Sequence, residues 1–283
     1  PADAWAPAIR EFTVRDAGTR RVMGTAYLDL FPRPDKFGHF AAFPIALSWQ
    51  RADGSHELPA VAIVGNWPAP GGKEPSLLSH GDVVTFFHEF GHAVAALADR
   101  SPYVTIGTNA LRQDFGEAPS QMLENWMWEP SVLARVSRHY VTGKPLPDSL
   151  IRRMLALKHF RDGYNGTGQA FYSAYDLALH SSGPSVDPLP LWNKLAAELT
   201  PLQDPEGSLG PASFGHLMSG YDAGYYGYLW SKVYAQDLYT RFAREGALNP
   251  RTGRAYRDMI LAPGATEEPD AVLQKFLGRP LSY

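Results

Sequence analysis

Thr85-Phe86-Phe87-His88-Glu89-Phe90-Gly91-His92-Ala93 is the stretch around which the rest of the 283-residue chain is organised. Two histidines four positions apart lie one above the other on a helix face, so both imidazoles can bind the same metal ion. The glutamate between them points toward that ion without being a ligand, and it can take a proton from a bound water. The spacing of His88, Glu89 and His92 therefore predicts a metal site with a general base beside it.

A third ligand is available at Glu117, which follows His92 after 24 intervening residues. Pro119 is typical of the first turn of a helix, so a second helix starting here would carry Glu117 at its N-terminal edge. Two histidines and one glutamate leave the fourth position of a tetrahedral Zn²⁺ open for water, which is the arrangement of a catalytic site. We expect one Zn²⁺ per chain, bound by His88, His92 and Glu117.

The alternative is that the two histidines lie on an exposed helix surface and that Glu89 and Glu117 are solvated charges. The residues around the histidines argue against it, because they make the helix apolar on nearly all sides and therefore buried. These residues are Val83, Val84, Phe86, Phe87, Phe90, Ala93, Val94, Ala95, Ala96 and Leu97. Histidine and glutamate side chains on a buried helix need partners, which a metal ion supplies.

At these residues the chain also resembles a known family. His-Glu-Phe-Gly-His (88–92), followed by Asp-Phe-Gly-Glu-Ala-Pro-Ser-Gln-Met-Leu-Glu-Asn-Trp (114–126), is similar to the thimet oligopeptidase family of zinc metallopeptidases. That family includes neurolysin, the bacterial oligopeptidases and the peptidyl-dipeptidases. The resemblance extends from about Gly24 to about Gly278. It implies a thermolysin-like zincin (gluzincin) catalytic domain that is mainly α with a small mixed β-sheet.

Composition excludes several other classes of function. The 26 Lys and Arg residues nearly balance the 29 Asp and Glu residues, so neither nucleic acid nor an anionic membrane is an expected partner. No apolar run approaches the roughly 18 residues that a membrane span needs. The chain has no cysteine, which excludes disulfides, a thiol nucleophile and a Cys-ligated metal. Histidines and carboxylates are therefore the only strong zinc ligands in the sequence.

Members of the resembled family are much longer than this chain and have a mostly helical half in front of the region that it matches. We therefore expect residues 1–283 to form a single metallopeptidase catalytic domain and to be a fragment of a longer, two-lobed oligopeptidase. The resemblance implies a cytoplasmic monomer. A periplasmic or secreted location stays open, because the chain lacks cysteine and any signal peptide would lie outside it.

The first part of the chain, about residues 24–67, predicts a small and mainly antiparallel sheet. Thr25 to Phe31 alternates as a strand does, and two apolar runs, His39 to Gln50 and Leu58 to Trp67, are joined across an Asp-Gly turn at 53–54. The resemblance implies that an edge of this sheet pairs with the extended backbone of the substrate, by strand addition. A sheet that only covers the core is an equally open interpretation.

Residues 79–128 are expected to form the metal-binding helices. Ser79 and Asp82 make a pair of the capping-box kind at the start of the first helix, which we expect to run to about Asp99. Further on, Gln121 or Glu124 could accept the hydrogen bond that orients a ligating imidazole, and an ordinary hydrogen bond is the alternative for either. The resemblance places Gly107 in a loop beside the substrate.

From Pro130 onward the chain is expected to be helical, with helices over Asp148 to Phe160 and Gly168 to Ser181. The glycine-rich segment between them, 161–168, lacks both phosphate-loop patterns and is not expected to bind phosphate. A long loop is expected from Pro201 to Pro211, because this segment is rich in proline and glycine.

A second stretch with chemical potential is the Tyr- and Gly-rich loop at 214–228, which leads into a long helix ending near Arg244. For any single tyrosine, packing in the core is the simpler interpretation. Several phenols interleaved with glycine are different, because a phenol donates a hydrogen bond without charge, which suits an oxyanion beside zinc. The resembled family has a signature here, and its functional positions are occupied by His216, Tyr221, Tyr225 and Tyr228. Ser219 replaces the first of the family's paired glycines.

Together these residues predict zinc-dependent hydrolysis of peptide bonds in short oligopeptides, with Glu89 as general base on a zinc-bound water. By resemblance, Tyr228 with Tyr221 would stabilise the oxyanion, while His216 and Tyr225, with the loop at Gly107, would hold the substrate. Two alternatives stay open. One is a zinc-containing peptide-binding module without turnover, and the other is a metal-dependent amidohydrolase that acts on non-peptide substrates.

Overall fold

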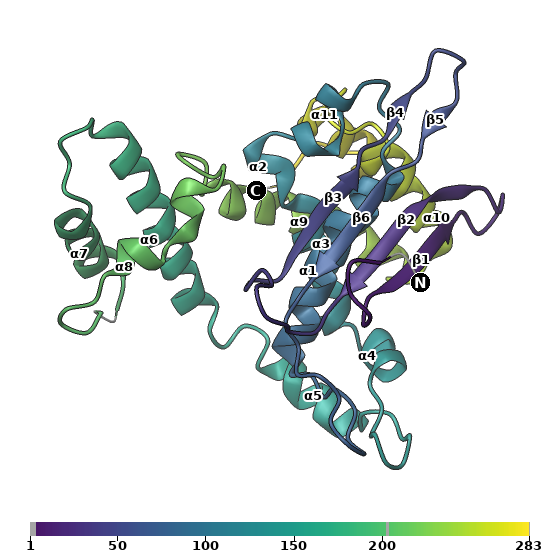
Figure 1. Ribbon diagram of the computed structural model, residues 1–283, viewed down its shortest axis with the longest axis horizontal. Helices are drawn as coiled ribbons and strands as arrows, with labels where there is room; N and C mark the ends of the chain where they lie inside the picture. Colours follow the sequence, from purple (N-terminus) through teal and green to yellow (C-terminus); the bar gives the residue numbers. More distant parts are fainter. Residues whose placement is uncertain (1–3, 202–203, 283) are drawn as a thin grey trace.

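The computed structural model describes residues 4–201 and 204–282. The chain forms a main body, in which helices lie behind a β-sheet, and a smaller helical lobe that projects from the body (Figure 1). The lobe consists of α6 (Asp162–Ser181), α7 (Pro188–Leu199) and α8 (Gly210–Ser213). Of the helices in the described residues, none has the combination of length and apolar composition that a bilayer crossing requires.

The sheet has four strands in the order β1-β2-β6-β3. Their bounds are β1 (Arg10–Arg15), β2 (Val22–Asp29), β6 (Ala60–Val64) and β3 (Ala41–Ala46). The central pair β2–β6 is parallel, and β1 and β3 pair antiparallel at the two edges. A short hairpin, β4 (Trp49–Gln50) and β5 (His56–Glu57), surrounds the predicted Asp-Gly turn. The predicted mixed sheet is therefore confirmed, and β1 is an additional strand that the sequence analysis did not anticipate.

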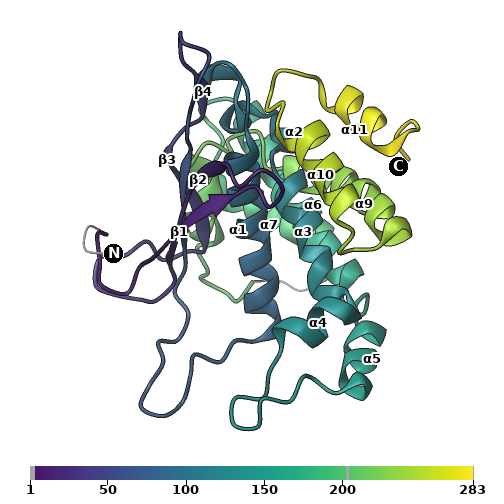
Figure 2. The same cartoon turned by 90° about the vertical axis from the view of Figure 1, so that its right-hand side faces the viewer.

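The long helix α1 (His80–Ala98) lies directly behind the sheet, and α3 (Ala118–Glu124) and α9 (Gly227–Glu245) follow behind α1 (Figure 2). One buried cluster joins the sheet to α1. It contains Val61 and Ile63 of β6, Ala26 of β2, and Ala93 and Leu97 of α1. Because α1 is covered by the sheet on one side and by α3 on the other, it is apolar on most of its surface.

The ends of α1 agree with the sequence prediction. The Ser79 hydroxyl caps the first turn and the Asp82 carboxylate accepts a hydrogen bond from the Ser79 backbone, so the capping box is complete. The helix ends at Ala98, with Asp99 as the next residue.

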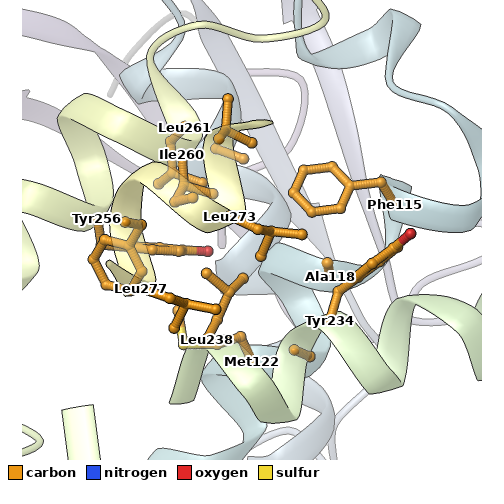
Figure 3. Close-up of a cluster of buried hydrophobic side chains, with 14 of the residues drawn as sticks. Phe115, Ala118, Met122, Tyr234, Leu238, Tyr256, Ile260, Leu261, Leu273 and Leu277 are labelled. Atoms are coloured by element: carbon orange, nitrogen blue, oxygen red, sulfur yellow. The ribbon is translucent and has the colours of Figure 1, made fainter. Parts of the chain in front are cut away.

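A second and larger buried cluster lies behind α3, where α9, α10 (Pro250–Tyr256), the π-helical turn η5 (Arg257–Leu261) and α11 (Pro269–Leu277) pack together (Figure 3). The remaining helical segments connect these elements. They are η1 (Val104–Ile106), η2 (Thr108–Ala110), α2 (Gln113–Gly116), η3 (Asn125–Trp128), α4 (Pro130–Val136), α5 (Asp148–Ala156) and η4 (Gly215–Met218).

Two predicted helix boundaries are wrong. α5 ends at Ala156, four residues before the predicted end, and α6 begins at Asp162, so the glycine-rich segment forms its first turns. Each glycine costs about 1 kcal/mol relative to alanine in a helix, which weakens these turns without forbidding them. Asp162 lies in the first turn, where a carboxylate is favoured, and its Oδ2 lies 2.6 Å from His159 Nδ1. In the predicted loop at 201–211, residues 202 and 203 lie outside the described residues, and α8 begins at Gly210.

Candidate metal centre and active site

His88 and His92 lie one turn apart on α1, with ring centroids 5.1 Å apart. Their Nε2 atoms lie 3.1 Å and 3.0 Å from one oxygen of Glu117, Oε2. Within residues 4–201 and 204–282, this is the group of three His, Cys, Asp or Glu side chains whose ligand atoms lie close enough together to hold one metal ion. The structure thus brings together the three residues that the sequence analysis proposed as zinc ligands.

The close approach of α3 to α1 puts Glu117 opposite the two histidines. Gly91 lies between the histidines on the side of α1 that faces α3. A Cβ at this position would lie 2.5 Å from the Ser120 Cα and 2.6 Å from the Pro119 carbonyl oxygen, so only glycine fits. The glycine of HEFGH therefore allows the backbone contact that places the third ligand.

Glu117 is the residue between α2 and α3, and it caps the N-terminus of α3 with Pro119 in the first turn. Its backbone N–H donates to the Ser231 hydroxyl over 3.2 Å, and that hydroxyl donates to the Asp114 carbonyl over 2.9 Å. Ser231 belongs to α9 and is fully buried. The position of the Glu117 backbone is thus fixed by a helix that is distant in sequence.

Hydrogen bonds surround the group and orient its ligand atoms. Glu124 Oε1 lies 2.7 Å from His88 Nδ1, which leaves Nε2 directed at the centre. The Ser120 hydroxyl donates to Glu117 Oε2 over 2.8 Å, and the Tyr221 hydroxyl donates to Glu117 Oε1 over 2.6 Å. Of the two residues proposed to orient a ligand, Glu124 does so. Gln121 instead donates to the Tyr228 carbonyl over 3.0 Å.

The charges of the group depend on one another. Burial by itself would raise the pKa of Glu117, but hydrogen bonds from His88 and His92 hold it well below its usual value. Burial likewise opposes a charge on His88, yet the hydrogen bonds with Glu117 and Glu124 raise its pKa to about 10. The centre therefore keeps a buried carboxylate ionised, and it attracts positive charge.

The donor set fits Zn²⁺. Two imidazole nitrogens and one carboxylate oxygen are ligands that zinc prefers, and three protein ligands leave a position for water. Atoms bound at about 2.0–2.1 Å to a tetrahedral Zn²⁺ lie about 3.3 Å from one another, close to the 3.0 Å and 3.1 Å separations seen here. These two separations therefore need to change little when the ion binds.

Glu89 lies beside this group, and only 7% of its surface is exposed. Burial raises its pKa above the usual value, while the neighbouring His88 and His92 and a hydrogen bond from the Ala42 backbone act in the opposite direction. Ala42 belongs to the edge strand β3. The carboxylate is thus enclosed between the metal helix and the sheet, with a pKa shifted toward neutrality, as a general base requires.

The four residues predicted in the Tyr-rich loop form one aromatic cluster. The His216 ring packs edge-on against the rings of Tyr221, Tyr225 and Tyr228, with centroids 5.2–5.8 Å apart. The rings of Tyr221 and Tyr228 stack with centroids 5.2 Å apart, and the Tyr228 hydroxyl lies 3.5 Å from His216 Nε2. Burial raises the pKa of both phenols, so both remain neutral donors at physiological pH. Through Tyr221 the cluster reaches Glu117.

Gly107 lies between η1 and η2, beside Asp99, the residue that follows α1. A Cβ at this position would lie 2.6 Å from Asp99 Oδ2, and the next nearest atoms belong to Asn109 and Ser101. Asp99 also accepts from the Thr108 N–H over 2.7 Å. The structure thus explains why glycine is needed here, while a role of Gly107 in substrate binding stays a prediction.

Comparison with known proteins agrees with this geometry. The profile described as Peptidase family M3 matches residues 1–283. The chain belongs to peptidase family M3. This confirms the resemblance to thimet oligopeptidases and their relatives.

Three relatives illustrate how this M3 chain matches longer proteins. It is 34% identical over 279 residues to the thimet-like oligopeptidase of Dictyostelium discoideum, covering 97% of the chain and 42% of that protein. It is 37% identical over 278 residues to saccharolysin of Saccharomyces cerevisiae, covering 96% of the chain and 39% of that protein. It is 35% identical over 285 residues to oligopeptidase A of Escherichia coli, covering 98% of the chain and 41% of that protein. The chain therefore spans about two fifths of the length of these relatives.

Among solved structures, a carboxypeptidase from Pyrococcus furiosus superposes on the M3 chain with a TM-score of 0.56 at 15% sequence identity. The superposition covers 91% of this chain and 52% of that protein. At this identity the comparison supports the fold, and it agrees with the predicted zincin-type architecture of helices behind a small mixed sheet.

Sequence reasoning missed several residues that build the centre of the M3 chain. Gly91, Ser120 and Ser231 are ordinary residue types, and each acts through a contact between distant elements. Gly91 alone carried a signal, because a glycine inside an otherwise apolar helix indicates close approach of another backbone.

Proposed function

We propose that this protein is a zinc-dependent peptidase that hydrolyses peptide bonds in short oligopeptides. The observation that carries the proposal is the buried Glu89 carboxylate beside the group of His88, His92 and Glu117. Membership of family M3 supports peptide hydrolysis, and the relatives named oligopeptidase support short peptides as substrates.

One Zn²⁺ per chain, held by His88, His92 and Glu117, would supply a Lewis acid and lower the pKa of a water molecule. Glu89 is proposed to take a proton from the attacking water and to pass it to the leaving amine. Its enclosure between α1 and β3 supports this role, because exclusion of water strengthens the interaction of a fixed carboxylate with a reacting group.

The tyrosines are proposed to act on the oxyanion. Tyr221 donates to Glu117 and stacks on the ring of Tyr228, so both phenols already lie beside the ligand group. A small change in the side chains would let Tyr228, assisted by Tyr221, donate to an oxyanion that forms next to the zinc ligands. His216 is proposed to contact the substrate from the same cluster, and Gly107 from another loop. Tyr225 is buried in the core of the lobe and is proposed to support the ring of His216.

The substrate is proposed to bind along β3. This strand is a free edge of the sheet, its last four residues are exposed, and Ala42 within it contacts Glu89. An extended peptide that adds to this edge would bring a peptide bond near the general base. Binding through the backbone would allow many peptide sequences to be accepted.

A peptide-binding module without turnover is less well supported. Such a module has no need for Glu89, and a buried carboxylate that does no chemistry costs stability without benefit. An amidohydrolase acting on non-peptide substrates would have the same centre, but it would have no need of the peptide-accepting edge at β3.

Turnover of an internally quenched fluorogenic peptide tests the proposal. Glu89→Gln preserves shape and should keep one zinc per chain while turnover falls about 10²–10⁴-fold, the usual contribution of a positioned general base. Asp237→Asn, at a buried carboxylate on α9 that pairs with Arg279, is the matched control and should retain turnover. Undiminished turnover in Glu89→Gln, or an unmodified protein that binds zinc but cleaves no peptide, would contradict the proposal.

A further inference from the structure

Asp176 is a fully buried carboxylate in the C-terminal half of α6, and no step of the proposed mechanism uses it. Its two oxygens accept hydrogen bonds from two backbone N–H groups of the Tyr-rich loop. Oδ1 accepts from Ala223 and Oδ2 accepts from Tyr225, each over 3.0 Å. His180, one turn further along α6, places Nδ1 3.0 Å from Oδ1. A buried carboxylate is costly unless its lone pairs are satisfied, and here the loop satisfies them.

The backbone that Asp176 holds has an unfavourable conformation. Ala223 has φ +56°, in the left-handed region that residues other than glycine rarely adopt. Such a residue persists only where its surroundings fix it. Asp176 accepts hydrogen bonds from the N–H groups of Ala223 and Tyr225, so these bonds are placed to hold the backbone in this conformation.

Other residues of the loop contact α2. Gln113 of α2 donates to the Gly220 carbonyl over 2.7 Å, and a Cβ at Gly227 would lie 2.2 Å from the Gln113 carbonyl oxygen. α2 therefore contacts the loop at Gly220 and Gly227, and α6 holds the backbone between them at Ala223 and Tyr225. Tyr221 lies between the attachments at Gly220 and Ala223, and Tyr228 directly follows Gly227 at the start of α9.

We propose that Asp176 is a positioning residue for peptide hydrolysis, because it fixes the loop backbone from which Tyr221, Tyr225 and Tyr228 extend. This inference rests on the proposed function of the tyrosines. It also assigns a role to the lobe, whose helix α6 would set the position of donors that act at the metal centre. Displacement of the backbone at 223–225 would shift the phenols relative to Glu117 while leaving the zinc ligands, which α1 and α3 hold, in place.

Asp176→Asn tests this role, because asparagine has the same shape but can accept from only one of the two N–H groups. Zinc binding should be unchanged and KM should change little, while kcat falls about 10²-fold, the scale for misplacing a catalytic group by about 1 Å. Hydrogen exchange gives a readout independent of activity, and the amides of Ala223 and Tyr225 should exchange faster. Asp237→Asn is again the matched control, and it should leave kcat and exchange in the loop unchanged.

A double-mutant comparison separates positioning from general stability. If Asp176 acts through the phenols, adding Asp176→Asn to Tyr228→Phe should cost much less than it does in the unmodified protein. The inference is overturned if Asp176→Asn and Tyr228→Phe lower kcat by independent factors that multiply in the double variant. It is also overturned if Asp176→Asn lowers kcat no more than Asp237→Asn does. If Asp176→Asn does not fold, Asp176→Ser leaves room for a water at the two amides and takes its place, with the same expected and contrary results.

The failure of this inference can be told apart from the failure of the proposed function. Undiminished turnover in Glu89→Gln contradicts the proposed function. Loss of turnover in Glu89→Gln and in Tyr228→Phe, with kcat and loop exchange unchanged in Asp176→Asn, refutes the role of Asp176 alone.

Discussion

Gly91 of α1 packs on the backbone of Ser120 in α3, so closely that a Cβ at position 91 would lie 2.5 Å from the Ser120 Cα. Ser120 lies in the first turn of α3, the helix that directly follows Glu117, and the Ser120 hydroxyl donates to the Glu117 carboxylate. The distance between the two helices therefore determines how far the third ligand lies from the two histidines. A residue without a side chain controls the geometry of the metal centre.

Gly91→Ala should weaken zinc binding by at least about tenfold and lower the free energy of unfolding by about 1–3 kcal/mol, because the added methyl group forces α1 and α3 apart. Gly81→Ala in the first turn of α1 is the matched control. Its Cβ would meet only the Ser79 hydroxyl oxygen, at 3.7 Å, so zinc affinity should not change. Competition with a chromophoric chelator and thermal unfolding measure the two effects, and equal behaviour of the two variants would disprove the packing argument.

Removal of zinc should lower the melting temperature, and added zinc should restore it, with one ion bound per chain. A ligand that binds only the folded state stabilises that state by about 2.7 kcal/mol when its free concentration is about 100 times its Kd. His92→Gln should abolish this stabilisation. His80→Gln should preserve it, because His80 lies on α1 but contacts the Met127 carbonyl outside the centre. Affinity should fall as the pH is lowered, because protons compete with zinc for the imidazoles. Stabilisation by zinc in His92→Gln equal to that in His80→Gln would remove His92 from the ligand set.

Tyr228→Phe should lower kcat by about 10²–10³-fold, because it removes one donor to the oxyanion. KM and zinc content should stay close to those of the unmodified protein. Tyr226→Phe, two residues earlier at an exposed position, controls for loss of a hydroxyl in the same segment and should have little effect. Steady-state kinetics with a fluorogenic peptide provide the test, and similar kcat values for the two variants would assign the oxyanion donor elsewhere.

Stability at acid pH should depend on Asp29, which is buried at the end of β2. Burial opposes its charge, but hydrogen bonds from Arg33 (2.7 Å), Lys36 and Trp5 (2.9 Å) lower its pKa to about 2. A carboxyl group with a lowered pKa contributes stability above its unfolded pKa of about 4, and this contribution, about 2 kcal/mol, is lost as the pH falls toward 2.

Asp29→Asn should therefore lower stability at pH 7 and flatten the decline between pH 4 and 2 in denaturant titrations. Glu267→Gln, at an exposed ion pair with Lys275, should change neither quantity by more than a few tenths of a kcal/mol. An unaltered acid profile in Asp29→Asn would show that other groups cause the decline.

The sequence was sufficient for those features that depend on local spacing. The four-residue spacing of the histidines, the capping pair at Ser79 and Asp82, and the proline after Glu117 each act within one or two helix turns, and the structure shows them as expected. The sequence analysis did not predict β1, because this edge strand contains charged residues and lacks a clear alternation of apolar and polar residues. Its pairing with β2 became visible only in the folded chain.

Contacts between distant segments explain the other omissions. Asp176 lies 47 residues before Ala223, and Ser231 lies 114 residues after Glu117. Neither pair produces a pattern in a single sequence, because aspartate and serine are common in helices for unrelated reasons. The expected start of α6 was wrong for a related reason, since its glycines lower helix propensity without excluding a helix.

The aromatic side chains of the loop belong to a different core from that of the metal ligands. Tyr225, Phe214 and Leu217 are buried with Phe171 and Trp192 in the lobe, whereas Ala118 and Met122 of the ligand helix α3 are buried in the main body. On heating, the smaller core of the lobe should melt first, because it buries less apolar surface. Thermal inactivation would then precede release of the metal, and a sample that has lost its activity could still contain a full complement of zinc.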